Sequence, residues 1–357
     1  MKQLYRNMDY MDDIQYVANL DFDWMQLKDK NVFLSGATGL IGSFLVDVLM
    51  YKNNTMDFNC HVFALTRNEK RAQERFLEYE GDQRLTFVLG DVTDREVFND
   101  FKQMDYVLHL ASNTHPMQYS TDPIGTITTN IIGLQNMLEY AVRSNAKRFV
   151  FASSNEIYGE NRGDVELFDE DYCGYINCNT MRAGYPESKR CGEALCQAYK
   201  AQKGLDVVIP RLTRSYGPTM LQSDTKAISQ FIKKAIAGED IVLKSAGTQY
   251  YSYQYVADSV SGLLSVLFKG VNGEAYNIAE EHSDIMLKDL ASLIAKTCGR
   301  DVVFEIPDAV EAAGYSRATK ARLNGGKLEA LGWKPRYDIK MGIERTIKIL
   351  TNLRDFE

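Results

Sequence analysis

Six short apolar stretches alternate with segments of helical spacing within residues 30–212, and this alternation constrains the fold more than any other feature. The apolar stretches lie in "KNVFLS", "CHVFALTRN", "LTFVLGDVTD", "MDYVLHLAS", "AKRFVFASS" and "LDVVIPRL". Strands that alternate with helices pair in parallel through right-handed crossovers. The pattern therefore predicts an α/β fold built on a doubly wound parallel sheet.

The alternation loosens after residue 212, where predicted helices in "SQFIKKAIAGE", "LKDLASLIAKTCG" and "MGIERTIKILTNL" are separated by short extended pieces. This change predicts a smaller, mixed α/β lobe at the C-terminal end. We expect an N-terminal extension in residues 1–30, a dinucleotide-binding domain in 31–212 and a substrate-binding lobe in 213–357. Residues 160–182 are expected to reach the smaller lobe, and some of its segments to return to the first domain. For the extension, the sequence predicts only an extra helix, packed on the outside or on a partner.

Charge and composition exclude several classes of function. The net charge is −7 and Lys and Arg form no long block, which disfavours nucleic acid as a partner. No apolar run reaches the roughly 18–20 residues that a membrane-spanning helix needs. The Asp-rich start is unlike a signal peptide, so we expect a cytoplasmic protein. The six cysteines and four histidines follow no ligand pattern, and no metal site is predicted.

Gly36, Gly39 and Gly42 in "GATGLIG" stand between the first predicted strand and a helix. Glycines there permit a tight turn, close approach of the backbone to a pyrophosphate, and tight packing of the helix. The helix N-terminus then faces the phosphates. Three glycines alone are weak evidence, but this turn also opens an alternating fold. The sequence therefore predicts a Rossmann-type sheet that binds a dinucleotide.

The end of the second strand distinguishes NAD from NADP. An acidic residue there binds the adenosine ribose of NAD, whereas an arginine accommodates the 2′-phosphate of NADP. This chain has Thr66 and Arg67 and no acid, so NADP is favoured and NAD stays open. Asp91 in "GDVTD" is expected near the adenine, although a capping role for Asp91 or Asp94 explains that motif nearly as well.

Tyr185 and Lys189 in "YPESK" are four residues apart on a predicted helix and share one face. The positive charge of a lysine beside a phenol favours the phenolate, which predicts a lowered pKa for Tyr185. Tyr185 is then a candidate base for a sugar or alcohol hydroxyl, and Lys189 can also reach the nicotinamide ribose. Such a pair alone is common, and it becomes specific through the glycine turn and a serine after the fifth strand.

With these motifs the chain resembles the extended short-chain dehydrogenase/reductase family from about residue 30 onward. The similarity rests on "GATGLIG", "GDVTD", "HLAS", "SSNEIYG", "YPESK" and "YGP". It implies a catalytic triad of Ser154, Tyr185 and Lys189. It also implies a cofactor site made of Gly36, Thr38, Gly39, Leu40, Ile41, Gly42, Thr66, Arg67, Asp91, Val92, Leu110, Ala111, Ser112, Asn130, Tyr185, Lys189 and Pro210, in which Asn130 has a supporting structural role.

Within this family, "KRCGEALCQAY" and "GTQYYSYQYVAD" are most similar to UDP-glucuronate decarboxylases and nucleotide-sugar 4,6-dehydratases. The resemblance implies oxidation of a sugar at C4, which acidifies the C5 proton and weakens the bond to a C6 carboxylate. Glu156 comes two residues after Ser154 at a predicted strand end, so both project to the same face. We expect Glu156 to transfer a proton at C5 or to position the leaving group. The alternative is a purely structural salt bridge or cap.

Three positions depart from these relatives and leave the substrate open. Arg214 replaces an asparagine that touches the nucleotide-sugar, Tyr251 replaces a phosphate-binding arginine, and Thr219 stands where many decarboxylases have arginine. Arg214 can take over the phosphate contact, because guanidinium suits bidentate phosphate binding. A different activated sugar is the other explanation. The expected substrate contacts are Asn113, Glu156, Arg211, Arg214 and Tyr251.

The sequence thus predicts a nucleotide-sugar lyase, either a decarboxylase or a 4,6-dehydratase, that works with NAD or NADP. Two alternatives remain: an epimerase or reductase with the same triad, and a dinucleotide-binding regulator without catalysis. The intact triad argues against the regulator. The resemblance also implies a homodimer packed through the helices at 123–144 and 185–203. The alternative is a monomer whose helices only cover the sheet.

Overall fold

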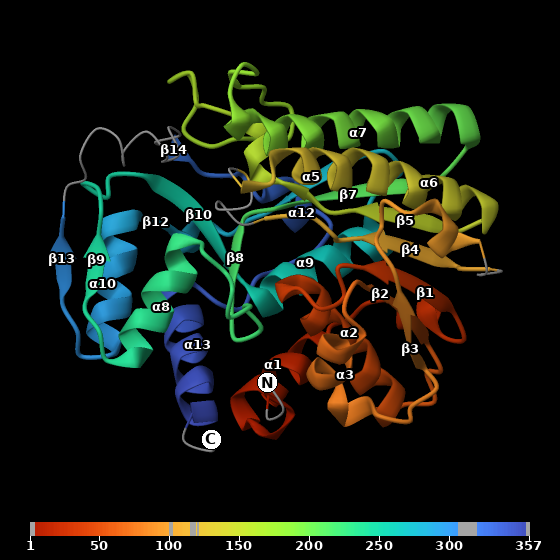
Figure 1. The fold of residues 1–357 in the computed structure, drawn as a ribbon, viewed down its shortest axis with the longest axis horizontal. Coiled ribbons are helices and arrows are strands. Elements are labelled where there is room, and N and C mark those ends of the chain that lie inside the picture. Colours follow the sequence, from red (N-terminus) through yellow and green to blue (C-terminus); the bar gives the residue numbers. More distant parts are fainter. Residues whose placement is uncertain (1–3, 100–102, 115–118, 120, 306–319, 355–357) are drawn as a thin grey trace.

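A computed structural model describes residues 4–99, 103–114, 119, 121–305 and 320–354 (Figure 1). Among the helices in these ranges, none has both the length and the apolar character that crossing a bilayer requires. The main sheet is entirely parallel, with the order β11-β7-β5-β4-β1-β2-β3 and the short β6 paired to β7. Its strands are β1 (Asn31–Ser35), β2 (His61–Thr66), β3 (Leu85–Leu89), β4 (Tyr106–His109), β5 (Arg148–Phe151), β6 (Ser153–Ser154), β7 (Val207–Leu212) and β11 (Ala275–Ile278).

Helices cover both faces of this sheet and explain why its strands are apolar on both sides. One face carries α5 (Pro123–Thr128), α6 (Leu134–Arg143) and α7 (Gly184–Lys203), drawn above the sheet in Figure 1. The other face carries α2 (Leu40–Thr55), α3 (Glu69–Arg75) and α9 (Val256–Lys269). The predicted doubly wound sheet is confirmed. The helix predicted from residue 123 is present and continues without a break from α5 through a π-helical turn at Thr129–Gly133 into α6.

The turn after β1 shows why glycine is needed at its first position. Gly36 has φ +75°, and a Cβ atom there would lie 2.7 Å from the backbone nitrogen of Ala111. The end of β1 therefore approaches the end of β4 more closely than a larger residue allows. Helix α2 begins at Leu40, directly after this turn. The strand, turn and helix predicted from "GATGLIG" are all present.

The smaller lobe contains two further sheets. β10 (Tyr250–Tyr255) pairs in parallel with β8 (Arg214–Tyr216) and β14 (Lys320–Ala321), and antiparallel with β12 (Asp284–Met286). β9 (Ile241–Leu243) pairs in parallel with β13 (Val302–Phe304). The helices of this lobe are α8 (Ala227–Ala237), α10 (Leu287–Thr297), α12 (Gly326–Glu329) and α13 (Ile339–Arg354). The predicted mixed α/β lobe is confirmed. β11 lies beside β7 in the main sheet, and the predicted division into domains, with boundaries at residues 30 and 212, remains a prediction.

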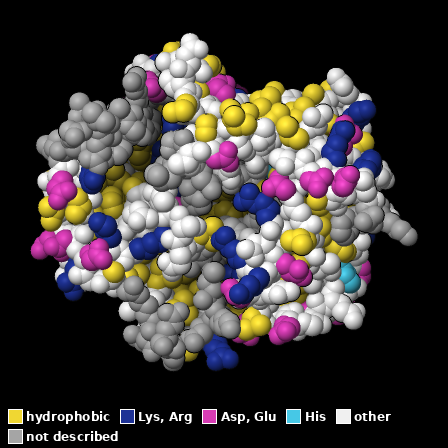
Figure 2. Space-filling view, in the orientation of Figure 1, with side chains coloured by type: hydrophobic (Ala, Val, Ile, Leu, Met, Phe, Trp, Pro, Cys, Tyr) yellow, Lys and Arg dark blue, Asp and Glu magenta, His cyan; other side chains and the backbone are white. Residues whose placement is uncertain are grey.

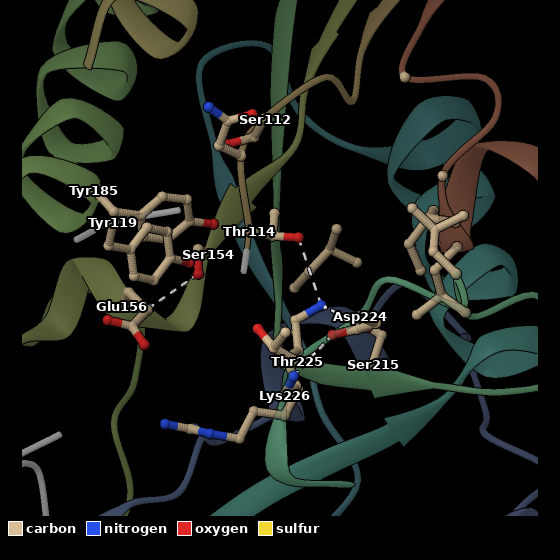
Figure 3. Close-up of a pocket in the computed structure, with 18 of the residues that line it drawn as sticks. Ser112, Thr114, Tyr119, Ser154, Glu156, Tyr185, Ser215, Asp224, Thr225 and Lys226 are labelled. Carbon is tan, nitrogen blue, oxygen red and sulfur yellow. Dashed lines mark hydrogen bonds and ion pairs between the residues drawn. The ribbon is translucent and has the colours of Figure 1, made fainter. Parts of the chain in front are cut away.

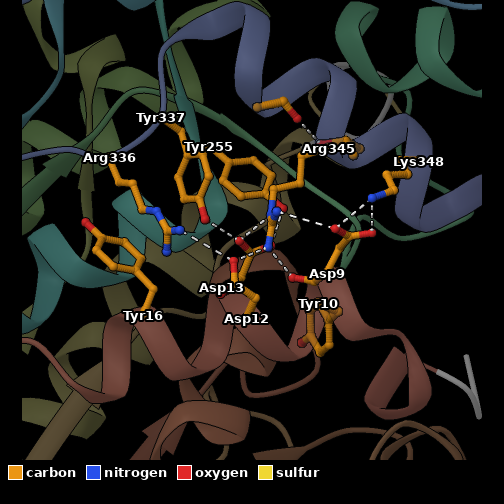
Figure 4. Close-up of polar contacts among 12 residues, drawn as sticks. Asp9, Tyr10, Asp12, Asp13, Tyr16, Tyr255, Arg336, Tyr337, Arg345 and Lys348 are labelled. Atoms are coloured by element: carbon orange, nitrogen blue, oxygen red, sulfur yellow. Dashed lines mark hydrogen bonds and ion pairs between the residues drawn. The ribbon is translucent and has the colours of Figure 1, made fainter.

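Helix α1 (Met8–Ala18) bridges the two lobes. Toward the smaller lobe, the fully buried carboxylate of Asp13 accepts hydrogen bonds from Tyr255 Oη at 2.7 Å and Tyr337 Oη at 2.6 Å (Figure 4). It also accepts one from Arg345 Nε of α13, at 2.6 Å. Toward the main sheet, Tyr10 donates to Asp47 of α2, which is paired with Arg75 of α3. The predicted extra helix therefore exists, and its hydrogen bonds reach both halves of the molecule.

Candidate active site

A cavity of about 930 Å³ lies at the carboxyl ends of the parallel strands, where ligands bind in doubly wound sheets. The residue that follows a strand lines it in several cases: Gly36 after β1, Arg67 after β2 and Leu110 after β4. Residues of β8, β10 and α8 close the opposite side, so the cavity lies between the two lobes (Figure 3). Its walls thus combine a cofactor half and a substrate half.

The glycine turn forms the cofactor half. The first turn of α2 opens directly onto the cavity, and the helix N-terminus offers unpaired backbone N–H groups to an anion. The residues present therefore fit a dinucleotide pyrophosphate. The predicted cofactor residues that line the cavity are Gly36, Thr38, Gly39, Leu40, Ile41, Gly42, Thr66, Arg67, Asp91, Val92, Leu110, Ala111, Ser112, Tyr185 and Lys189.

Two predicted cofactor residues lie outside the cavity lining. Pro210 is buried in β7, where its register partner is Tyr276 of β11. Asn130 sits in the π-helical turn, accepts a hydrogen bond from Ser112 Oγ at 2.6 Å and donates one to Ser188 Oγ at 2.8 Å. Ser188 Oγ in turn donates to the carbonyl of Tyr185. Asn130 thus supports the active-site helix, in agreement with its expected structural role.

Charged residues surround the end of β2. Arg67 is 3.7 Å from Asp91, and Arg71 of α3 lines the same part of the cavity. Asp91 also caps its own turn by accepting hydrogen bonds from the Thr93 backbone and hydroxyl. Burial opposes ionisation of Asp91, but these bonds and the Arg67 charge keep its pKa below the usual value. Asp91 therefore both lines the cavity and caps a turn, and Asp94 caps the next turn through Glu96 N.

The four predicted catalytic side chains converge on one wall of the cavity. Ser154, Glu156, Tyr185 and Lys189 all line it, and Figure 3 shows Ser154, Glu156 and the ring of Tyr185 close together. Lys189 Nζ lies 6.0 Å from the centre of the Tyr185 ring and donates a hydrogen bond to the Ala152 carbonyl at 2.8 Å. The spacing of four residues on α7 places Tyr185 and Lys189 on one helical face, as expected.

Burial dominates the ionisation of this pair. It raises the pKa of Tyr185 to about 12, although a hydrogen bond from Ser154 and the charge of Arg182 lower it. Burial also lowers the pKa of Lys189 to about 7, against the opposing charge of Glu193. The pKa of Tyr185 is therefore raised and not lowered as predicted, because burial disfavours the charged phenolate.

Glu156 is placed by a turn and not by a strand. β6 ends at Ser154, and Glu156 lies in a 3-10 turn at Asn155–Tyr158, with its backbone N–H donating to Ser154 Oγ at 3.2 Å. The predicted strand end does not extend to Glu156, yet both side chains line the cavity. Arg182 Nη2 donates to the two carboxylate oxygens of Glu156 at 2.9 and 2.7 Å.

The substrate half contains two of the three unusual positions. The guanidinium of Arg214 lies over the ring of Tyr251, with 3.6 Å from Cζ to the ring centre, and both residues line the cavity. Asn113 lines it as well. Thr219 is buried outside the lining, where its hydroxyl donates to the Leu40 carbonyl.

The prediction that Arg211 binds substrate is not supported by its position. Arg211 is absent from the cavity lining, and its guanidinium is bound to both carboxylate oxygens of Glu193 at 3.0 and 2.7 Å. It also donates to Tyr158 Oη and to the carbonyl of Glu170. These bonds anchor the segment after the active-site turn to β7 and α7, so Arg211 has a structural role.

Several cavity residues were missed by the sequence argument: Arg71, Thr114, Tyr119, Arg182, Lys226 and Lys244. Arg182 stands three residues before Tyr185, and this proximity was the available signal. Tyr119 stacks on Tyr185 with 4.9 Å between ring centres, which no spacing in the sequence indicates. Within the described residues, no group of three or more His, Cys, Asp or Glu side chains is arranged to hold a metal ion.

A model of the NAD dependent epimerase/dehydratase family matches residues 32–279. This chain belongs to that family. UDP-glucuronic acid decarboxylase 1 of Xenopus tropicalis is 32% identical over 89% of this chain and 71% of its own length. UDP-glucuronic acid decarboxylase 6 of Arabidopsis thaliana is 31% identical over 88% of this chain and 87% of its own length.

Solved structures agree with this family assignment. A double mutant of dTDP-glucose 4,6-dehydratase from Streptomyces venezuelae, with NAD and DAU bound, has a TM-score of 0.77 at 25% identity and covers 91% of this chain and 98% of its own. UDP-glucose 4-epimerase of Thermotoga maritima, with UDP-glucose, has a TM-score of 0.78 over 92% of this chain and all of its own, and at 23% identity shows the fold alone. This epimerase/dehydratase family member is therefore an enzyme of the extended short-chain dehydrogenase/reductase type.

Proposed function

We propose that this enzyme is an NAD(P)-dependent nucleotide-sugar decarboxylase whose substrate is UDP-glucuronate. The observation that carries the proposal is the carboxylate of Glu156 beside Ser154 and Tyr185 on one wall of the cavity. An acid at this position suits a reaction with a proton transfer after oxidation at C4. The similarity to UDP-glucuronic acid decarboxylases supports the same choice.

The first half of the reaction is an oxidation at C4. When bound in the glycine-turn half, the nicotinamide cofactor supplies a hydride acceptor and later returns the hydride. Tyr185 first loses its own proton, and its phenolate then accepts the proton of the C4 hydroxyl as the C4–H bond breaks and its electron pair leaves with the hydride, so that the hydroxyl becomes a ketone. The Ser154 hydroxyl is placed to hydrogen-bond the reacting oxygen. Ser154 and Tyr185 thereby act together on one oxygen.

The second half breaks the C5–C6 bond. Carbon dioxide leaves from the C6 carboxylate, and the electron pair of the broken bond forms an enolate with the ketone at C4. Glu156 takes up one proton from solvent and transfers it to C5, so hydrogen replaces the lost carboxylate and the overall reaction consumes one proton. Tyr185 returns its proton to the C4 oxygen as the ketone is reduced again. The net products are carbon dioxide and a nucleotide pentose, and the cofactor is regenerated.

Basic side chains in the substrate half suit the diphosphate of such a substrate. Arg214, Lys226 and Lys244 line this part of the cavity in a protein whose net charge is −7. The guanidinium of Arg214 lies over the Tyr251 ring, 3.6 Å from Cζ to the ring centre, and its N–H groups suit bidentate binding to phosphate. We propose that Arg214 supplies the phosphate contact that Tyr251 cannot make.

Mass spectrometry tests this function directly. The purified enzyme is incubated with NAD or NADP and UDP-glucuronate, and loss of carbon dioxide from the sugar is the expected result. Loss of water from a nucleotide-hexose, with UDP-glucuronate unchanged, would make the enzyme a 4,6-dehydratase. This outcome would be consistent with threonine at position 219, where many decarboxylases have arginine. An unchanged mass with both substrates would rule out both lyase reactions.

The end of β2 supports NADP as the preferred cofactor. Arg67 and Arg71 both line the cavity there, so two guanidinium groups can meet a 2′-phosphate. NAD is bound in the related dehydratase structure, and its use by this enzyme stays open.

An apolar helix surface supports a homodimer. Ile124 is 74% exposed, and Ile127 and Ile132 are also exposed on α5 and the turn that follows it. Figure 2 shows hydrophobic side chains gathered over the edge where Figure 1 draws α5 and α7. We propose that two copies pack through these helices, because pairing would bury this surface.

A further inference from the structure

Arg182 connects two chemical groups of the active site. It lies in the 3-10 turn Met181–Ala183, directly before α7, and lines the cavity. Its Nη2 contacts both carboxylate oxygens of Glu156, while its Cζ lies 4.7 Å from the centre of the Tyr119 ring. Tyr119 stacks on Tyr185 at 4.9 Å with an interplanar angle of 28°. The Arg182 guanidinium therefore contacts Glu156, the candidate acid, directly. It is linked to Tyr185, the candidate base, through the ring of Tyr119.

The geometry of the ion pair keeps Glu156 available for chemistry. A carboxylate has about four lone-pair directions. A single nitrogen of Arg182 engages one direction on each oxygen, so each oxygen retains a lone pair for a proton. The side chains of Arg182 and Glu156 are 39% and 25% exposed, which places the pair at the cavity wall and not in the core. Arg182 thus holds the Glu156 carboxylate in place while each carboxylate oxygen can still accept a proton.

Electrostatics links the same residues. The charge of Glu156 raises the pKa of Arg182, against the opposing effect of burial. The charge of Arg182 acts to lower the pKa of Tyr185, and that of Glu156 acts to raise it. Removal of Arg182 would leave the Glu156 carboxylate near a desolvated phenol without a neutralising cation.

We propose that Arg182 is a positioning residue that holds the Glu156 carboxylate in place for the proton transfer that follows sugar oxidation. This inference rests on the proposed function, because it assigns Arg182 to the second half of that reaction. The competing role is purely structural: Arg182 would only tie the segment before α7 to the turn after β6. The two roles differ in which half-reaction the residue affects.

The experiment separates the two half-reactions by rapid mixing of enzyme, cofactor and UDP-glucuronate. Absorbance of the reduced nicotinamide follows sugar oxidation, and trapped carbon dioxide follows C5–C6 cleavage. In Arg182→Gln we expect product formation to fall about 100-fold or more, in the range typical of a displaced acid–base group, while oxidation changes less than about threefold. Reduced cofactor then accumulates. Arg182→Lys should recover part of the loss, because it restores a cation near Glu156.

Two further measurements test the route through Glu156. The double variant Arg182→Gln/Glu156→Gln should lose no more activity than Glu156→Gln alone, since the effects of residues acting as one unit are not additive. Guanidinium ion should rescue Arg182→Ala but not the Ala variant that also carries Glu156→Gln. The control is Arg162→Gln, which removes an exposed ion pair with Asp164 in the same segment and should behave as wild type.

The possible failures are distinguishable. Wild-type enzyme that oxidises and cleaves no UDP-glucuronate would overturn the proposed function. Wild-type turnover accompanied by an equal loss of both half-reactions in Arg182→Gln, or by multiplicative losses in the double variant, would overturn the positioning role alone. Thermal unfolding of each variant identifies a folding defect, and in that case the Arg182→Lys variant and guanidinium rescue still decide between the two roles.

Discussion

The side chains of Tyr185 and Lys189 are both buried in the active site. Their exposed fractions are 5% and 2%, and burial disfavours the charged form of each side chain. The phenol is therefore neutral near pH 7, and its ionisation depends on groups that stabilise the phenolate. The Ser154 hydroxyl and the Arg182 guanidinium act in that direction.

Replacing Tyr185 with Phe tests the assigned base. The ring and its stacking on Tyr119 are retained, while the proton acceptor is lost. We expect turnover to fall about 100- to 10,000-fold with cofactor affinity unchanged, measured by steady-state kinetics and calorimetric titration of the cofactor. Tyr175→Phe, at a side chain that is 61% exposed, is the matched control. Retained turnover in Tyr185→Phe would exclude this residue as the base.

The proposed preference for NADP over NAD depends on Arg67 and Arg71, which follow β2. In the double variant Arg67→Ala/Arg71→Ala we expect NADP affinity to fall about 10-fold or more and NAD affinity to change little, because only NADP carries the 2′-phosphate. Calorimetric titration of each cofactor measures the difference. Lys70→Ala removes a neighbouring exposed cation that does not line the cavity, and it should leave both affinities unchanged. Equal losses for NAD and NADP would contradict the preference.

Lys189 makes stability depend on pH in a defined direction. Its pKa is about 7 in the folded protein, against 10.5 for an unperturbed lysine, so between these values the unfolded chain binds a proton that the native protein does not. The free energy of unfolding should therefore rise as pH increases from about 7 to about 10.5, relative to Lys189→Met. The change is at most about 5 kcal/mol, at about 1.4 kcal/mol per pKa unit. Urea unfolding of both proteins across this range measures it, and an unchanged difference would contradict a buried neutral lysine.

At the scale of elements, α1 has a structural role in both lobes. It packs on α2 and α9 and contacts α13, and the side chains of Tyr10, Ile14 and Val17 are fully buried. Burial raises the pKa of Asp13, while the hydrogen bonds of Tyr255 and Tyr337 and the charge of Arg345 oppose that shift. The helix is thus part of the core.

Asp13→Asn tests this role. The substitution leaves Arg345, whose side chain is 18% exposed, without its buried carboxylate, and we expect the free energy of unfolding to fall by about 3 kcal/mol. Asp12→Asn removes another carboxylate that pairs with the same arginine but is 51% exposed, so its cost should stay below about 1 kcal/mol. Chemical unfolding of both variants measures the difference. Equal costs would show that burial of Asp13 contributes nothing.

The elements of the main sheet were predictable from sequence, whereas contacts between distant segments were not. Each strand carries its own apolar pattern, and "GATGLIG" and "YPESK" place their residues through local backbone geometry. Arg182 and Glu156 meet only because the segment between them folds back, so neither position alone indicates the pair. The same applies to Tyr119 and to the partners of α1. Arg211, expected as a substrate contact, is paired with Glu193, another contact between distant segments that the sequence does not indicate.

At the scale of the whole molecule, the two faces of the sheet differ in how completely they are covered. The face with α2, α3 and α9 is covered further by α1, whereas α5 and the turn after it expose Ile124, Ile127 and Ile132. These exposed apolar side chains are the basis of the proposed dimer, because burying them against a second copy would remove them from water.

Ile124→Glu/Ile132→Glu tests the proposed dimer. Charges placed on both sides of an isologous interface face each other across the twofold axis, so we expect a monomer in sedimentation velocity. Met341→Glu, at a residue of α13 that is 47% exposed, should leave the dimer intact. A wild-type protein that sediments as a monomer at all concentrations would contradict the proposal.

The bridge formed by α1 also affects the order of events during synthesis. Asp13 leaves the ribosome early, but Tyr337 and Arg345, its partners, are 324 and 332 residues further along the chain. Closing loops of this length carries an entropic cost, and such contacts form late. The apolar side of α1 can pack on α2 soon after that helix emerges, whereas the buried carboxylate of Asp13 must wait for Tyr337 and Arg345. The packing of α1 is therefore completed only after α13 has been synthesised.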